Sequence, residues 1–96
     1  MNEPILHIYG QEAFHDDVYI AGNREGMDLL CNAILRSMNG ALSGAEVSVC
    51  DGEWYTITVR VYSNEDAEKL AVPYTEDFAK ERREAAIWPW KKEGER

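Results

Sequence analysis

The compact group of side chains with acid–base potential in this sequence is His15-Asp16-Asp17. A histidine beside carboxylates can titrate near neutrality and act as a general base. No plausible nucleophile or metal ligand accompanies this trio, and polar residues of this kind are common in solvated loops. We therefore interpret the trio as loop residues and predict a protein that is not an enzyme.

The glycines Gly22 and Gly26 bracket a helix start, and a helix N-terminus can bind an anion. Glu25 and Asp28 already place negative charge at that end. A turn followed by a helix cap is therefore the interpretation that we favour, rather than an anion site. The chain also lacks the standard nucleotide-binding, hydrolase and zinc-protease motifs.

The two cysteines, Cys31 and Cys50, are not spaced as metal ligands, and the two histidines are isolated. Cys31 has the spacing of a helix core position, so we expect it to be a small buried apolar group. A disulfide between the two is disfavoured in a reducing compartment. We predict no metal site and no cofactor.

The composition fits one small globular domain. The chain has 96 residues, of which 45% are apolar and 29% charged. We predict a single domain over residues 1–90 and a frayed tail at residues 91–96. The acid and proline near the start do not fit a signal peptide, and no apolar run approaches bilayer length. A cytoplasmic protein without membrane contact is therefore expected.

The net charge of −8 is unevenly distributed. Residues 1–79 carry 14 acids against four bases, so −10, whereas residues 80–96 carry six bases against four acids, so +2. Such a field repels nucleic acid and attracts a basic partner. It also fits a simpler role in keeping a small protein soluble.

The clearest predicted element is a helix at residues 24–38. Asn23 is a good N-cap, and Asn39-Gly40 fits a helix end because glycine tolerates the left-handed conformation. Apolar residues recur along one face of this segment: Met27, Leu30, Cys31, Ile34, Leu35 and Met38. This stripe predicts the face that fills the core.

Two strand pairs surround this helix in the sequence. Residues 5–9 and 17–21 predict two short antiparallel strands, and residues 45–50 and 53–62 predict a hairpin. A two-residue loop in the hairpin would set apolar residues against polar ones. A three-residue loop, Cys50-Asp51-Gly52, pairs Val47 with Tyr55 and gives Gly52 its left-handed position. We predict the three-residue loop.

The order of elements predicts an α+β fold with a four-stranded antiparallel sheet in ββαββ order. The long helix should cover one face, and a helical C-terminal region should follow. Ser63 begins an S-x-x-D capping signal for a short turn over residues 64–70. Thr75 should cap a second helix over residues 76–86, which Pro89 ends near Trp88.

Two features suit protein binding. One is the sheet face opposite the helix, where aromatic residues and arginine could anchor an interface unless the C-terminal region covers it. The other is the segment 87–90, IWPW, which either docks on the same domain or serves as a recognition tail beside Lys91-Lys92. The predicted protein-binding residues are Asp16, Asp17, Asp51, Glu53, Trp54, Arg60, Tyr62, Trp88 and Trp90.

Three motifs resemble the immunity protein 32 family of bacterial polymorphic-toxin systems. They are IYG at residues 8–10, VYIAGNREG at residues 18–26 and DGEWYTITV at residues 51–59, within a likeness that covers about residues 5–61. The resemblance implies a non-enzymatic antidote that binds a cognate toxin. The acidic balance suits a basic toxin such as a nuclease or deaminase. The alternative is a homodimer in which Trp54 and Tyr62 lie between subunits.

Overall fold

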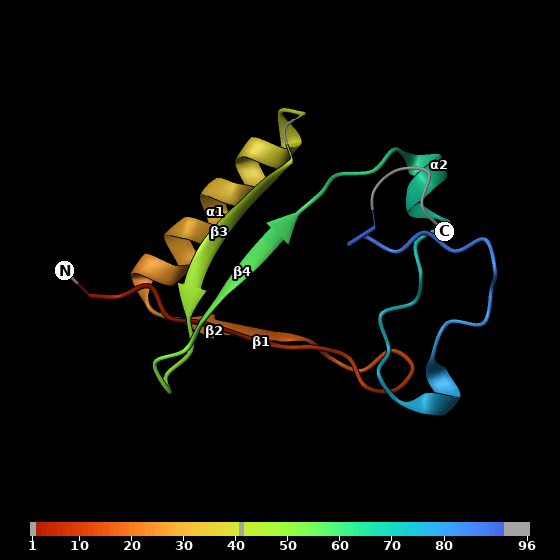
Figure 1. The fold of residues 1–96 in the computed structure, drawn as a ribbon, viewed down its shortest axis with the longest axis horizontal. Helices are drawn as coiled ribbons and strands as arrows, with labels where there is room; N and C mark the ends of the chain where they lie inside the picture. Colours follow the sequence, from red (N-terminus) through yellow and green to blue (C-terminus); the bar gives the residue numbers. More distant parts are fainter. Residues whose placement is uncertain (1, 41, 92–96) are drawn as a thin grey trace. The chain divides into compact units, whose positions relative to one another are not determined.

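The computed structural model describes residues 2–40 and 42–91. They belong to two compact units (Figure 1). The first unit comprises Met1–Tyr9 and Tyr19–Val61, and the second comprises Gly10–Val18 and Tyr62–Arg96. The α+β class is confirmed. The single domain over residues 1–90 stays a prediction, and residues 92–96 of the predicted tail lie outside the described residues.

The first unit contains all the strands that the structure assigns in the described chain: β1 (Leu6–Tyr9), β2 (Tyr19–Gly22), β3 (Ser43–Ser48) and β4 (Trp54–Val59), with helix α1 (Arg24–Met38) between β2 and β3. The predicted four-stranded sheet is wrong. The strands form two separate antiparallel pairs, β1 with β2 and β3 with β4. Helix α1 lies mainly against the second pair (Figure 1).

One backbone hydrogen bond and several side-chain hydrogen bonds, rather than a strand ladder, join the segment around β1 to the second hairpin. The backbone N–H and the hydroxyl of Ser48 both donate to the Pro4 carbonyl, at 2.7 and 2.9 Å. The Tyr55 hydroxyl donates to the Leu6 carbonyl, and burial raises the pKa of this hydroxyl, which favours its protonated donor form. The only strand-type pairing between the segment before β1 and the described part of the second hairpin is the isolated parallel bridge between Ile5 and Ser48. Individual hydrogen bonds therefore hold β1 beside this hairpin, without a continuous sheet.

A further hydrogen bond joins β1 to the β3–β4 turn. The Cys50 backbone N–H donates to His7 Nε2 at 3.0 Å. The other ring nitrogen, Nδ1, lies 2.9 Å from the Tyr9 hydroxyl oxygen. His7 therefore connects two segments that are 43 residues apart in the sequence.

Both predicted ends of α1 are confirmed. The Asn23 side-chain oxygen accepts the Gly26 backbone N–H at 2.9 Å, as an N-cap does. The same oxygen accepts the Ile5 N–H at 2.9 Å, which ties the helix start to the segment before β1. At the other end Gly40 has a φ of 94°, the left-handed conformation that favours glycine.

The face of α1 that packs on the sheet agrees with the predicted one only at Met27 and Leu30. The buried residues are small: Gly26, Ala33 and Ser37. A Cβ at Gly26 would lie 2.1 Å from the Ile5 carbonyl oxygen, so only glycine allows this approach. The remaining stripe residues, Cys31, Ile34, Leu35 and Met38, are exposed, and the expectation that Cys31 is buried is wrong. The core consists of Leu6, Val47 and Ile57, joined by the half-buried Met27, Leu29, Leu30, Tyr55 and Val59.

The register of the β3–β4 hairpin is confirmed. Val47 pairs with Tyr55, and the Val49 N–H donates to the Glu53 carbonyl at 2.8 Å. Gly52 has a φ of 94° in the three-residue loop. The alternation of β4 therefore directs Tyr55, Ile57 and Val59 toward α1, as the sequence pattern predicts.

The second unit has little regular structure. Helix α2 (Asn64–Ala67) begins with the predicted cap, because the Ser63 hydroxyl accepts the Asp66 N–H at 3.1 Å. The predicted helix over residues 76–86 is wrong, since only a 3₁₀ turn, η1 (Asp77–Ala79), forms there. The N–H groups of Thr75 and Glu76 donate to the Glu12 carbonyl, at 3.1 and 2.9 Å, so Thr75 does not begin a helix.

The Glu81 carboxylate organises the chain after η1. Its side chain is 3% exposed and accepts the backbone N–H groups of Val72 and Arg83, at 2.9 and 2.7 Å. The Arg83 guanidinium donates to both carboxylate oxygens, at 2.9 and 2.8 Å, and also to the Leu70 carbonyl at 2.7 Å. These bonds replace a helical pattern in this segment, where residues 84 and 85 form a turn and Ile87 pairs with Leu70 in an isolated parallel bridge.

Candidate protein-binding surface

The His15-Asp16-Asp17 trio shapes a loop. The Asp16 carboxylate accepts the N–H groups of Ala13 and Glu12, at 2.9 and 3.3 Å. His15 has a φ of 60°, and its ring meets the edge of Tyr74 at 6.3 Å between centroids. Among the described residues no cluster of three or more His, Cys, Asp or Glu could hold a metal ion. Both Asp16 and Asp17 are exposed, but the Asp16 carboxylate is bonded within its own loop.

The sheet face opposite α1 is the best formed of the predicted surfaces. Because Ser48 pairs with Trp54 and Glu46 pairs with Thr56, the side chains of these four residues project from the same face of the hairpin. Trp54 is 50% exposed, and Glu46, Thr56 and Thr58 are also exposed. Trp54 is thus a large aromatic side chain held on a rigid, register-fixed hairpin.

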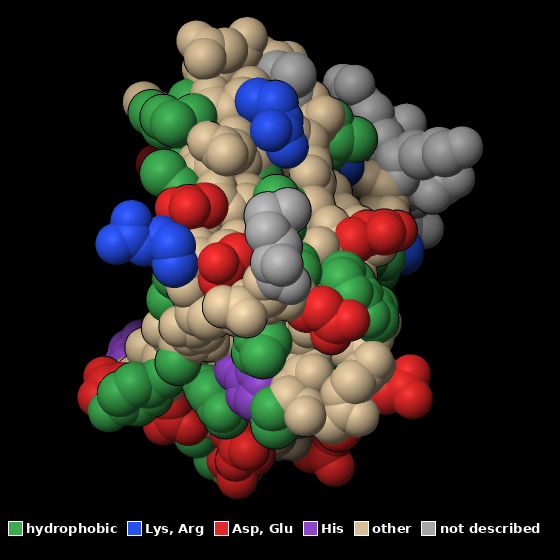
Figure 2. Space-filling view, turned by 90° about the vertical axis from the view of Figure 1, so that its left-hand side faces the viewer, with side chains coloured by type: hydrophobic (Ala, Val, Ile, Leu, Met, Phe, Trp, Pro, Cys, Tyr) green, Lys and Arg blue, Asp and Glu red, His purple; other side chains and the backbone are tan. Residues whose placement is uncertain are grey.

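The turn beside Trp54 is held by its own side chains. Asp51 Oδ1 accepts the Glu53 N–H at 2.9 Å, which stabilises the loop from which β4 starts. The segment 43–59 contains three carboxylates, Glu46, Asp51 and Glu53, and no Lys or Arg. All three are exposed. On the face drawn in Figure 2, acidic side chains in red lie among hydrophobic ones in green.

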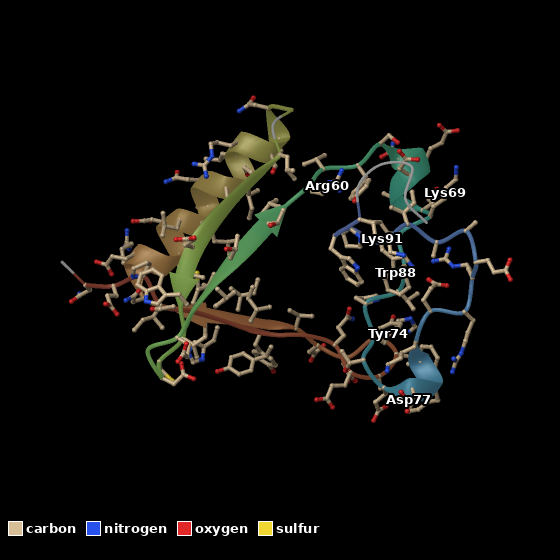
Figure 3. All side chains as sticks on the ribbon, in the orientation of Figure 1. Arg60, Lys69, Tyr74, Asp77, Trp88 and Lys91 are labelled. Atoms are coloured by element: carbon tan, nitrogen blue, oxygen red, sulfur yellow. The ribbon has the colours of Figure 1, made fainter. Side chains whose placement is uncertain are left out.

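Two residues that the alternation of residues 53–62 placed beside Trp54 do not lie on this sheet face. Strand β4 ends at Val59, so Arg60 follows the strand (Figure 3) rather than continuing its alternation. Tyr62 belongs to the second unit, where it is half-buried. The surface predicted from the alternation therefore stops at Thr58.

The two tryptophans near the C-terminus lie in the second unit. Their rings are 5.1 Å apart between centroids, with Trp88 half-buried and Trp90 exposed. Figure 3 labels Trp88 and Tyr74, which both belong to this unit. Trp88 also closes a turn, because its carbonyl accepts the Lys91 N–H at 3.0 Å. Whether the segment serves a partner as well stays a prediction.

One exposed surface escaped the sequence prediction, namely the outer side of α1. Ile34, Leu35 and Met38 are exposed because the helix packs through its small residues. The signal that could have indicated this was the spacing of Gly26, Ala33 and Ser37, seven and four residues apart on one helix face. Small residues at such spacing allow a close backbone approach, which the larger stripe would prevent.

Comparison with known proteins identifies no relative. A scan of family models finds no match to the chain, and no curated protein or solved structure matches it significantly. The resemblance to the immunity protein 32 family therefore stays a prediction from the quoted motifs. None of the helices in the described ranges is both long and apolar enough to cross a bilayer.

Proposed function

We propose that the chain is a non-enzymatic binding protein that blocks a basic protein partner, as an immunity protein blocks its toxin. The observation that carries the proposal is Trp54, half exposed on a rigid hairpin whose charged residues are all acidic. Buried tryptophans are among the commonest anchors of protein interfaces.

The charge of the hairpin selects the kind of partner. Glu46, Asp51 and Glu53 would attract a basic surface and speed its association. A Lys or Arg of the partner could also lie over the indole of Trp54, an arrangement that gains roughly 0.5–2 kcal/mol. A nucleic-acid-binding toxin would have such a basic surface, and covering it would block its substrate.

The test uses the product of the neighbouring gene, purified and titrated with this chain by calorimetry. Trp54→Ala should weaken binding by roughly 2 kcal/mol or more, about 30-fold. Thr58→Ala is the matched control, because it lies exposed on the same strand and face. If the two variants bound the partner with equal affinity, Trp54 would not be part of the interface.

Salt separates the electrostatic part of the proposal from the apolar part. Raising the ionic strength from about 0.05 to about 0.5 M should lower the association rate, because it screens the carboxylates of the hairpin. Glu46→Gln combined with Glu53→Gln should reduce this salt dependence. A rate that does not change with salt would exclude recognition by charge.

A further inference from the structure

The outer side of α1 forms a contiguous apolar surface with the chain that flanks it. Met38, Leu42 and Val61 line a hollow of about 200 Å³, together with Ser37, Gly40 and Arg60. Ile34 and Leu35 lie one helical turn before Met38, on the same side. We call the set Ile34, Leu35, Met38, Leu42 and Val61 the α1 patch.

The described elements of the first unit leave this patch uncovered. The main contacts of α1 are with β3, β4 and β2, all made from its inner side. The patch residues keep 40% (Ile34), 54% (Leu35), 69% (Met38), 67% (Leu42) and 63% (Val61) of their surface exposed. At roughly 150–200 Å² for a large apolar side chain, this is on the order of 500 Å² of surface.

That area agrees with what a homodimer requires. A standard interface buries roughly 800 Å² on each partner, of which about 65%, or about 520 Å², is apolar in homodimers. The α1 patch alone supplies about this amount. It also lies within the range of the largest exposed patch of a typical monomer, roughly 300–600 Å², and patches of that size are often functional.

The charge distribution favours a second copy over a basic partner at this surface. Helix α1 contains Arg24 and Arg36 against Glu25 and Asp28, so it is neutral within a chain of net charge −8. Two copies can therefore meet here without the repulsion that the rest of the chain would produce.

We infer that two copies of this chain associate through the α1 patch, with the helices antiparallel about a two-fold axis. A side chain of one copy then occupies the hollow beside Met38, Leu42 and Val61 of the other. The contact is isologous, so the same residues serve both sides. It leaves Trp54 and the acidic hairpin outside the interface.

Sedimentation velocity on the full chain, between about 5 and about 100 µM, tests this inference. We expect a species of twice the 11.0 kDa chain mass. Leu35→Glu should weaken the dimer roughly tenfold or more, because it places a charge in an apolar contact. A chain that stays monomeric throughout this range would overturn the inference.

Asn32→Glu is the matched control, since it introduces the same charge at an exposed position of α1 outside the patch. It should remain a dimer. Both variants should keep the helical circular dichroism of the parent, since neither position is buried. Equal dimerisation by the two variants would place the contact elsewhere and overturn the inference.

Trp54→Ala distinguishes this inference from the proposed function. The variant should dimerise like the parent while losing the basic partner. If Trp54→Ala is monomeric and Leu35→Glu is dimeric, the subunits meet through the open sheet face instead, and the α1 patch is excluded.

Discussion

The two units of the chain are stabilised by different means. The first unit has a buried apolar core, two β-ladders and a helix capped at both ends. In the second unit the described buried residues are two alanines, Ala79 and Ala86, and side chains bonded to backbone groups define its path. Apolar burial is cooperative across a core, whereas a single carboxylate such as Glu81 fixes only the groups it reaches. The first unit should therefore respond globally to mutation and the second locally.

The largest effect should follow from Leu6→Ala. Leu6 is fully buried in the core of the first unit, so the change leaves a cavity and should lower the free energy of unfolding by roughly 2–5 kcal/mol. Urea denaturation followed by circular dichroism measures it. Ile8→Ala, two residues along the same strand and 46% exposed, should cost less than about 1 kcal/mol. Similar losses would contradict the assigned core.

Gly26→Ala should have the next largest effect, and the sign of its change in the free energy of unfolding is informative. Replacing glycine by alanine inside a helix normally stabilises by roughly 1 kcal/mol. Here the new Cβ meets the Ile5 carbonyl oxygen, so we expect a loss of roughly 1–3 kcal/mol in the same assay. Gly10→Ala has open space around its Cβ and should change little. A stabilised Gly26→Ala protein would show that α1 does not approach Ile5 this closely.

Glu81→Gln should have the smallest effect on the whole chain, because it acts within the second unit. The variant keeps a similar shape but loses the charge that pairs with Arg83. Amide exchange at Val72 and Arg83 should accelerate, while exchange in α1 should not change. Faster exchange throughout α1 would contradict the separation of the two units.

The same carboxylate predicts a pH dependence. Hydrogen bonds from Arg83 and from the Val72 backbone lower the pKa of Glu81 from about 4.5 to about 2. A lowered pKa means that the folded state favours the ionised form. Its contribution is therefore fully present above about pH 4.5 and is lost as the pH falls toward 2. The protection of second-unit amides, taken as their exchange rate relative to an unfolded chain at the same pH, should fall across this window in the parent and fall less in Glu81→Gln.

The features predictable from the sequence were those decided locally. Asn23 caps the helix through its side chain, and Gly40 and Gly52 adopt the left-handed backbone conformation that their turns require. The hairpin register, and with it the face on which Trp54 lies, followed from the alternation and the loop length, whereas the exposure of Trp54 did not. Arg60 and Tyr62 were lost from the predicted surface because β4 ends before the alternating pattern does.

The features that were predicted wrongly depend on contacts between residues distant in the sequence. Ser48 and Tyr55 bond to carbonyls more than 40 residues away, and this divides the predicted sheet in two. Part of the inner face of α1 was assigned wrongly because the prediction followed the large hydrophobic residues of the helix. The helix instead approaches the neighbouring chain closely at Gly26, where only a small residue fits. The expected C-terminal helix does not form because backbone N–H groups donate instead to the Glu12 carbonyl and the Glu81 carboxylate, contacts that helix propensity does not include.

The bond between Cys50 and His7 determines where the imidazole keeps its hydrogen. Since Nε2 accepts a backbone N–H, the neutral ring carries its hydrogen on Nδ1, facing the Tyr9 hydroxyl. The two contacts together fix both the tautomer and the orientation of the ring, so this single side chain aligns β1 with the β3–β4 turn as well as with its own strand.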